Sequence, residues 1–330
     1  MSKKAAAGFF WLVVILFISI ITALMYGSSK IAPADIIYAL THPQIKSQIA
    51  VIIFKLRIPR IILGLLVGAG LSCCGGSFQA ILRNSLAEPY TLGVASGAAF
   101  AVTLAAMLGL SAIYLPFFAF FGSLSTISLV YAIAARKRFS NPTLILGGVT
   151  LSLLLSSMVL LLFALSKQAD VYHSIMWLMG DLTLSDIKLI KISAFFILPG
   201  ILSLIFLGRD IDVLCLGEEK AKHLGLNVSG VKAIIFFLAS LITGACIAVS
   251  GVIGFVGLII PHIVRFAFGI SHRTLLPAAG ILGAAFLVFC DTLARTIVSP
   301  LELPVGVITG IFGGIFFLTL LVRSGKWEVI

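Results

Sequence analysis

The sequence predicts an all-α membrane protein that crosses the bilayer many times. Its 330 residues are 60% hydrophobic and only 11% charged, with a mean hydropathy of +1.20. Water-soluble domains are about 45–50% apolar and about 25% charged. A chain this apolar cannot bury its surface in one or two soluble domains, so membrane lipid must surround most of it.

Apolar runs of roughly 17–22 residues, separated by charged residues, Pro or Gly, divide the chain into about ten predicted spans. Residues 1–330 are expected to form a single transmembrane domain, and the even number of spans places both termini on one side. The predicted spans are 9–26, 61–82, 92–108, 115–135, 143–164, 189–207, 231–249, 253–269, 277–296 and 305–322.

The basic residues indicate which side is the cytoplasm. With both termini inside, 14 of the 23 Lys and Arg residues are cytoplasmic and nine are outside, as expected for membrane proteins. The net charge of +11 is explained in the same way, and no basic run exceeds 136–138, so no nucleic-acid partner is expected. Lys55, Arg57 and Arg60 violate the rule, because they crowd the outer end of the second span.

The first span resembles a signal peptide, since Lys3 and Lys4 precede an apolar run over 9–26. We expect a retained helix, because the run is long enough to cross the bilayer and no Ala-x-Ala cleavage pattern follows it.

Glycine pairs at small-xxx-small spacing predict close helix packing in lipid. Examples are Gly64 with Gly68, and Gly93 with Gly97. The last span carries a longer series, Gly306, Gly310 and Gly314. Packing within the chain and a subunit interface along the last helix both fit this pattern.

Motifs for chemistry are missing from the sequence. It contains no GxxxxGK[ST] loop, HExxH or GxSxG pattern, and its His and Cys residues lack the spacing of metal ligands. The chain is therefore predicted not to be an enzyme and to bind no metal or cofactor itself. Asp291 is the main ionisable candidate within a span, and an i,i+4 pair with Arg295 explains it most simply. An ion-coupled secondary transporter acting without ATPase partners stays open as the alternative, and an intramembrane enzyme has less support.

The most hydrophilic stretch, 209–230, is predicted to be a cytoplasmic connection between the sixth and seventh spans. Within it, 217–225 is typical of a short helix, with glutamates at its start and Gly225 at its end. A simple connector and a lever for a soluble partner are both consistent with this pattern.

Several motifs in order resemble the FecCD-type permeases, the membrane subunits of type II ABC importers for iron-siderophores, haem and cobalamin. The resemblance covers nearly the whole chain. The motifs lie at 57–60, 68–72, 83–89, 92–94, 177–180, 216–219, 224–225, 253–258, 261–263 and 302–306.

The resemblance implies a type II ABC importer permease in a prokaryotic cell membrane, with ten helices per subunit. Its implied partners are a second copy of the permease, two cytoplasmic ATP-binding subunits that use ATP and Mg, and an extracytoplasmic solute-binding protein. The implied cargo is a metal chelate, with iron(III)-siderophore first and haem or cobalamin next.

By the same resemblance, Arg57, Arg60 and Arg295 are expected to dock acidic side chains of the binding protein, which explains the basic residues outside. Arginines that extend from helix ends toward the membrane surface are the simpler alternative.

The 217–225 helix resembles the coupling helix that contacts the ATPase. The residues implied in this contact are Gly217, Glu218, Glu219, Ala221, Leu224 and Gly225.

Two cytoplasmic turns, 84–89 and 140–143, resemble the inner gate of the family. Asn84, Leu86 and Asn141 are the residues expected to close the path, although Asn is also an ordinary turn residue.

Polar residues of the fifth span are candidates for lining the path. They are Thr150, Ser152, Ser156 and Ser157. Hydroxyl groups bonded to carbonyls of their own helix are the alternative explanation.

Overall fold

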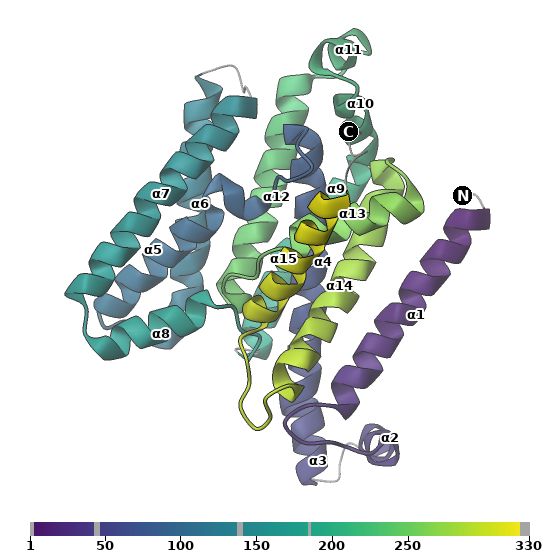
Figure 1. Cartoon of the computed structure of the whole chain (residues 1–330), viewed down its shortest axis with the longest axis vertical. Helices are drawn as coiled ribbons and strands as arrows, with labels where there is room; N and C mark the ends of the chain where they lie inside the picture. The colour runs from purple at the N-terminus through teal and green to yellow at the C-terminus, as the bar shows by residue number, and fades with distance from the viewer. Residues whose placement is uncertain (1–2, 43–46, 137–140, 184–185, 324–330) are drawn as a thin grey trace.

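The computed structural model describes residues 3–42, 47–136, 141–183 and 186–323, and every regular element in these ranges is a helix. The helices run between two ends of the molecule (Figure 1). We call the end with α10 (Gly208–Cys215) and α11 (Glu218–His223) the inner end, following the predicted orientation. The opposite end, with α2 (Pro33–Thr41) and α3 (Gln48–Val51), is the outer end.

Seven helices in the described part of the chain are long and apolar enough to cross a membrane. They are α1 (Lys3–Met25), α6 (Leu115–Ala135), α7 (Asn141–Leu165), α9 (Ile187–Phe206), α12 (Val228–Ser250), α14 (His272–Thr296) and α15 (Val305–Arg323).

Three further helices coincide with the remaining predicted spans. Helix α4 (Ile58–Leu82) has 25 residues, whereas α5 (Val94–Met107) and α13 (Val256–Phe268) are shorter apolar helices of 14 and 13 residues. Each predicted span therefore overlaps a helix, and the all-α fold class is confirmed. The number of membrane crossings and the side of the termini stay predictions.

Helix α4 is the centre of the bundle. Almost all of its length from Ile61 to Leu82 is buried, and it packs most extensively against α14 and then against α12, α13 and α9. Glycines permit this contact: a Cβ atom added at Gly68 would lie 2.3 Å from the carbonyl oxygen of Gly283, and one at Gly75 would lie 1.8 Å from that of Gly257. The backbones of α4, α13 and α14 thus touch directly.

Helices α5, α6 and α7 form a second packed group (Figure 1). A Cβ atom at Gly97 would lie 2.6 Å from the oxygen of Gly122, so α5 and α6 also meet at backbone distance. Close packing through the Gly93/Gly97 pair is therefore confirmed. Helix α12 contacts this group as well as α4 and joins the two halves.

Helix α15 uses its glycines in two ways. A Cβ atom at Gly306 would lie 2.3 Å from the oxygen of Met179, and one at Gly313 would clash with the ring of Phe255. By contrast, Gly310 and Gly314 face open space. Intrachain packing accounts for Gly306, and a subunit interface remains a prediction for the other two members of the series.

We predict that Gly68→Ala lowers the midpoint of thermal unfolding in detergent. The new methyl group would press on the backbone of Gly283, and overpacking of this kind costs about 1–3 kcal/mol. The matched control is Gly147→Ala in α7, where nothing lies within 4 Å of the added Cβ atom. Equal unfolding midpoints for the two variants would contradict the assigned packing.

Candidate functional site

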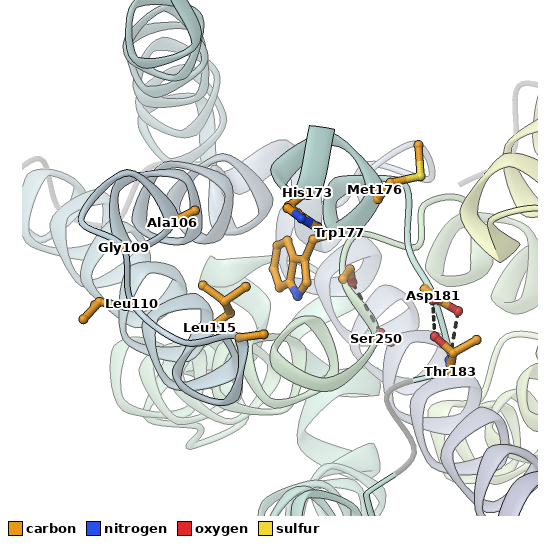
Figure 2. Close-up of a pocket in the computed structure, with 12 residues that line it drawn as sticks. Ala106, Gly109, Leu110, Leu115, His173, Met176, Trp177, Asp181, Thr183 and Ser250 are labelled. Atoms are coloured by element: carbon orange, nitrogen blue, oxygen red, sulfur yellow. Dashed lines mark hydrogen bonds between the residues drawn. The ribbon is translucent and has the colours of Figure 1, made fainter. Parts of the chain in front are cut away.

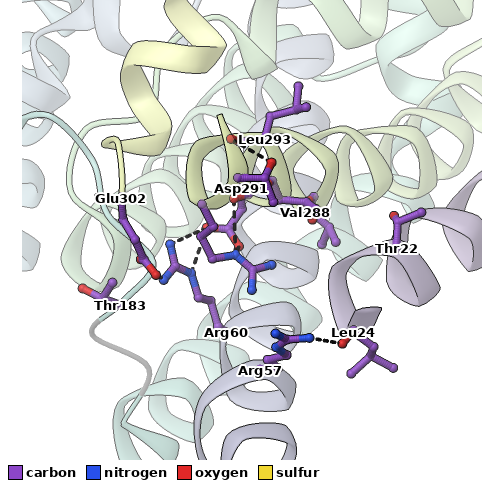
Figure 3. A network of polar contacts seen from close by, with 12 residues as sticks. Thr22, Leu24, Arg57, Arg60, Thr183, Val288, Asp291, Leu293 and Glu302 are labelled. Atoms are coloured by element: carbon purple, nitrogen blue, oxygen red, sulfur yellow. Dashed lines mark hydrogen bonds and ion pairs between the residues drawn. The ribbon is translucent and has the colours of Figure 1, made fainter. Parts of the chain in front are cut away.

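At the outer end, Arg60 of α4 holds two carboxylates from distant parts of the chain (Figure 3). Its Nε atom donates to Oδ1 of Asp291 at 2.9 Å, and its Nη1 atom donates to Oε2 of Glu302 at 2.6 Å. Oδ2 of Asp291 also forms an ion pair with Nε of Arg295 at 3.1 Å, so the predicted i,i+4 pair is confirmed. One ion-paired network therefore joins α4, α14 and the turn before α15.

Arg57 lies beside this network at the end of η1 (Ile52–Arg57), a π-helical segment that leads into α4. π-Helical turns are rare and often occur at functional sites. The guanidinium group donates to the carbonyl oxygens of Leu24 in the last turn of α1 and of Ser29 in the α1–α2 connection. Among the described residues no carboxylate lies within ion-pair distance of Arg57.

These three arginines line a cavity of about 220 Å³ together with Glu302. Three guanidinium groups against two carboxylates leave one excess positive charge, and Nη2 of Arg295 is buried without a hydrogen-bond partner. These arginines are less accessible than the predicted docking of a binding protein implies, because Arg57 and Arg295 are only 4% exposed. Pairing with Asp291 and Glu302 holds Arg60 and Arg295 inside the chain, and an acidic partner would have to reach into the cavity.

A second and larger cavity of about 480 Å³ lies toward the outer end between α5, α6 and α8 (Gln168–Leu178) (Figure 2). Its wall is mostly apolar, and Leu115 and Met176 are examples. Trp177 is buried against it, and its indole N–H has no hydrogen-bond partner in the described structure. Asp181 and Ser250 add polar atoms to the same wall.

The turn 251–255, which precedes α13, is held by contacts from several distant parts of the chain. A Cβ atom at Gly251 would lie 2.2 Å from the oxygen of Trp177. Phe255 has φ of +69°, a conformation that is strained for a bulky residue. Two side chains from the 84–93 segment hold this turn: Oε1 of Glu88 accepts from the N–H of Phe255 at 2.6 Å, and the hydroxyl of Tyr90 accepts from that of Ile253 at 3.2 Å.

At the inner end, α11 is a short helix between two glycines. Gly217 (φ +120°) precedes it, and Gly225 (φ +84°) ends it with paired hydrogen bonds from Gly225 N to Lys222 O and from Leu226 N to Ala221 O. Such paired bonds are a Schellman motif, so the predicted role of Gly225 as the stop is confirmed.

The exposed surface of α11 differs in part from the expected contact surface. Glu219 and Leu224 are exposed, and Leu224 is 65% accessible. Ala221 was expected to pack against a partner, but its side chain is fully buried in this chain's own core. The assignment of Ala221 is corrected accordingly, because a methyl group on the inward face of a helix cannot reach a partner.

Helix α10 is fixed to the start of α14 by Asp212. Its carboxylate accepts from the backbone N–H of His272 at 2.7 Å, lies 2.7 Å from the ring Nδ1 of the same residue, and accepts from the hydroxyl of Ser271 at 2.9 Å. Partial burial raises the pKa of Asp212, but the hydrogen bonds from His272 and Ser271 outweigh it and lower the pKa below its ordinary value.

The predicted gate residues lie near one another at the inner end. Oδ1 of Asn84 accepts from the N–H of Leu86 at 2.9 Å, and Leu86 is 59% exposed. Asn141 begins α7, and its Nδ2 atom donates to the carbonyl oxygen of Ile81 at 3.1 Å. The start of α7 is thus tied to the last turn of α4, next to Asn84. Ser140, in the second predicted turn, lies outside the described residues.

The candidate path residues all lie on α7, which leaves most of its surface uncovered in this chain. Thr150, Ser156 and Ser157 are exposed and Ser152 is half-buried. The hydroxyl of Ser157 donates to the carbonyl oxygen of Leu153 at 2.9 Å, so the bond to its own helix is present there. A path-lining role stays a prediction for all four.

Among the described residues, no group of three or more His, Cys, Asp and Glu side chains could hold a metal ion. The five cysteines are unpaired, and Cys215 is exposed while the other four are buried.

Comparison with known proteins decides the family. The model of the FecCD transport family matches residues 15–323. The chain belongs to the FecCD transport family. It is 36% identical over 276 residues to the hemin transport system permease protein HmuU of Yersinia pestis, covering 82% of this chain and 83% of that protein.

Two further relatives agree with this membership. The Fe(3+)-citrate import system permease protein YfmD of Bacillus subtilis is 38% identical over 307 residues, covering 92% of this chain and 90% of that protein. A solved metal-chelate type ABC transporter in an inward-facing conformation superposes with a TM-score of 0.85 at 32% identity, covering 97% of this chain and 99% of that chain. This FecCD protein is therefore a membrane permease of the metal-chelate class of ABC importers, and it is a transport component.

Sequence reasoning missed three residues that the structure places at these sites in the FecCD chain. The motif at 302–306 includes Glu302 but does not predict its pairing with Arg60, and the motif at 83–89 does not predict that Glu88 caps α13. The charge distribution predicts only that Lys232 is one of the 14 cytoplasmic Lys and Arg residues, yet the residue is buried, with 5% of its surface exposed. A signal was available: each is an ionisable residue at the edge of an apolar run, and such residues need partners.

We predict that Asp212→Asn loosens α10 from α14 and lowers the unfolding midpoint at neutral pH. The pKa of Asp212 is depressed in the folded state, so its contribution is complete above the ordinary value of about 4 and is lost as the pH falls through the lower folded pKa. The difference between wild type and variant should therefore shrink below about pH 4. A difference that stays constant down to pH 3 would contradict this role, and unfolding midpoints across the pH range provide the measurement.

Proposed function

We propose that this permease forms the membrane path of an ATP-driven importer for a ferric chelate, with iron(III)-siderophore as the cargo. Membership of the FecCD transport family carries the proposal. Relatives named for hemin and for Fe(3+)-citrate support an iron complex. Haem and cobalamin are the alternative cargoes.

We further infer a complex of two copies of this chain, two cytoplasmic ATPase subunits that use ATP and Mg, and an extracytoplasmic binding protein. Exposed Glu219 and Leu224 on α11 give an ATPase a surface at the inner end. At the outer end, the excess positive charge of the arginine cavity suits an acidic side chain of a loaded binding protein. Uncovered glycines on α15 support the second copy.

The mechanism that follows is alternating access. Docking of the binding protein and binding of ATP must each favour a different state of the permease, because a ligand with equal affinity for both states shifts nothing. ATP-driven movement of the ATPases would displace α11, and the contacts of the inner end would pass this displacement to the gate.

The alternative is an ion-coupled carrier without partners. Such carriers use intramembrane carboxylates as relays or ion sites. Here Asp291 is held by Arg60 and Arg295, and Glu88 caps the start of α13. Both carboxylates have structural partners, so the importer is the better supported function.

The first test measures ATPase activity in liposomes that contain this chain and the products of its neighbouring genes. Candidate binding proteins are added loaded with ferric siderophore, haem or cobalamin. We expect the siderophore-loaded protein to stimulate hydrolysis, Arg57→Glu to abolish the stimulation by charge reversal, and Arg57→Lys to retain most of it. If only the haem-loaded or the cobalamin-loaded binding protein stimulated hydrolysis, iron(III)-siderophore would be the wrong cargo. If the chain took up solute on an ion gradient without any ATPase, the importer function would be wrong.

The inner-end partner is tested by Leu224→Asp. Loss of a central contact side chain costs about 2 kcal/mol or more in an interface, and the aspartate would also bring an unpaired charge into it, so we expect at least about a tenfold loss of co-purified ATPase. The control is Leu301→Asp at the outer end, which changes a leucine of nearly equal exposure, 69% against 65%. Equal recovery of ATPase with both variants would show that α11 is not the contact.

A further inference from the structure

Lys232 lies in the second turn of α12 and bridges two functional regions. Its Nζ atom lies 2.5 Å from Oε1 of Glu218 on α11 and 3.0 Å from Oδ1 of Asn141 at the start of α7. Asn141 in turn donates to the carbonyl oxygen of Ile81 in the last turn of α4. A continuous series of polar contacts thus links the predicted coupling helix to the predicted gate.

Burial of Lys232 holds this series of polar contacts together. Lys232 is 5% exposed, and lysine is almost never buried to this extent unless its charge is paired. Glu218 supplies the opposite charge, and its side chain is 43% exposed. If α11 moved away alone, the ammonium group would be left in an apolar environment without its carboxylate. The favourable response is for Lys232 to keep both partners, so that α11 and the start of α7 move together.

A second connection runs alongside the first. Arg83, in the left-handed conformation directly after α4, donates from Nη2 to the carbonyl oxygen of Leu214 in α10 at 2.9 Å. This bond ends on an exposed arginine and a backbone oxygen and involves no opposite charge. The Lys232 bridge is therefore the stronger of the two, because it pairs two opposite charges, whereas only the donor is charged in the Arg83 bond.

We propose that Lys232 is the positioning residue that transmits movement of α11 to the inner gate, through Glu218 on one side and Asn141 on the other. This inference rests on the proposed function, since it requires an ATPase that moves α11. It adds a specific residue and a direction of transmission to that function. Lys232 touches neither cargo nor nucleotide in this role.

The test compares Lys232→Met with wild type and with Lys188→Met, which removes an exposed lysine at the start of α9. In proteoliposomes we expect Lys232→Met to keep ATP hydrolysis but to reduce chelate uptake per ATP by about tenfold, the equivalent of one lost charge-assisted hydrogen bond. Lys188→Met should behave as wild type.

A distance measurement separates transmission from a merely structural role. The distance is measured between a spin label at Lys222 in α11 and a second label at Leu146 in α7. Both positions are exposed. In wild type the two elements move together, so ATP should leave the distance within a subunit unchanged. In Lys232→Met the distance should change with ATP, because α11 moves without α7.

Asn141→Ala provides a second route if Lys232→Met fails to fold. This variant removes the bond from Lys232 to Asn141 on α7, while Lys232 keeps its bond to Glu218. It should likewise reduce chelate uptake per ATP. Wild-type uptake per ATP in both variants would overturn the role of Lys232 and leave the importer intact. Absence of ATP-driven uptake in wild type would overturn the proposed function and this proposal with it.

Discussion

Charged groups in a lipid-embedded chain must find partners within the protein, and this constraint organises the whole structure. The FecCD chain satisfies it at three levels. Arg60 holds Asp291 and Glu302 at the outer end, Glu88 caps α13 in the interior, and Lys232 holds Glu218 and Asn141 at the inner end. Each group joins segments that are distant in sequence. The few ionisable residues therefore determine how the apolar helices are registered against one another.

Close backbone contact is the second element of the architecture. Apolar attraction between helices is weak in lipid, so packing depends on small residues that let the helices approach. Gly68 and Gly75 bring α4 against α14 and α13, and Gly97 brings α5 against α6. The helices packed around α4 form a rigid group. The cavity lined by Arg57, Arg60 and Arg295 lies at its outer end, and the contacts of Lys232 lie at its inner end. Such a body can carry a displacement from one membrane face toward the other without deforming.

The sequence predicts the fold class and the position of each apolar span well, because hydropathy and helix length are local properties. It does not predict the shorter helices α2, α3, α8 and α10. It also predicts the stop at Gly225 and the pair between Asp291 and Arg295, since both depend on neighbours within one or two turns. Contacts between distant segments could not be derived in this way. The burial of Ala221, the pairing of Arg60 with Glu302 and the bridge at Lys232 depend on tertiary packing, and no local spacing encodes them.

The central claim is that this permease moves its cargo by ATP-driven displacement of the inner end. The most direct measurement is uptake of radiolabelled ferric siderophore by proteoliposomes that contain the co-purified complex and the loaded binding protein, with ATP inside and ionophores present. The account predicts uptake that requires ATP and is unchanged when ionophores collapse all ion gradients. Uptake that persists without ATP and disappears with the ionophores would contradict it.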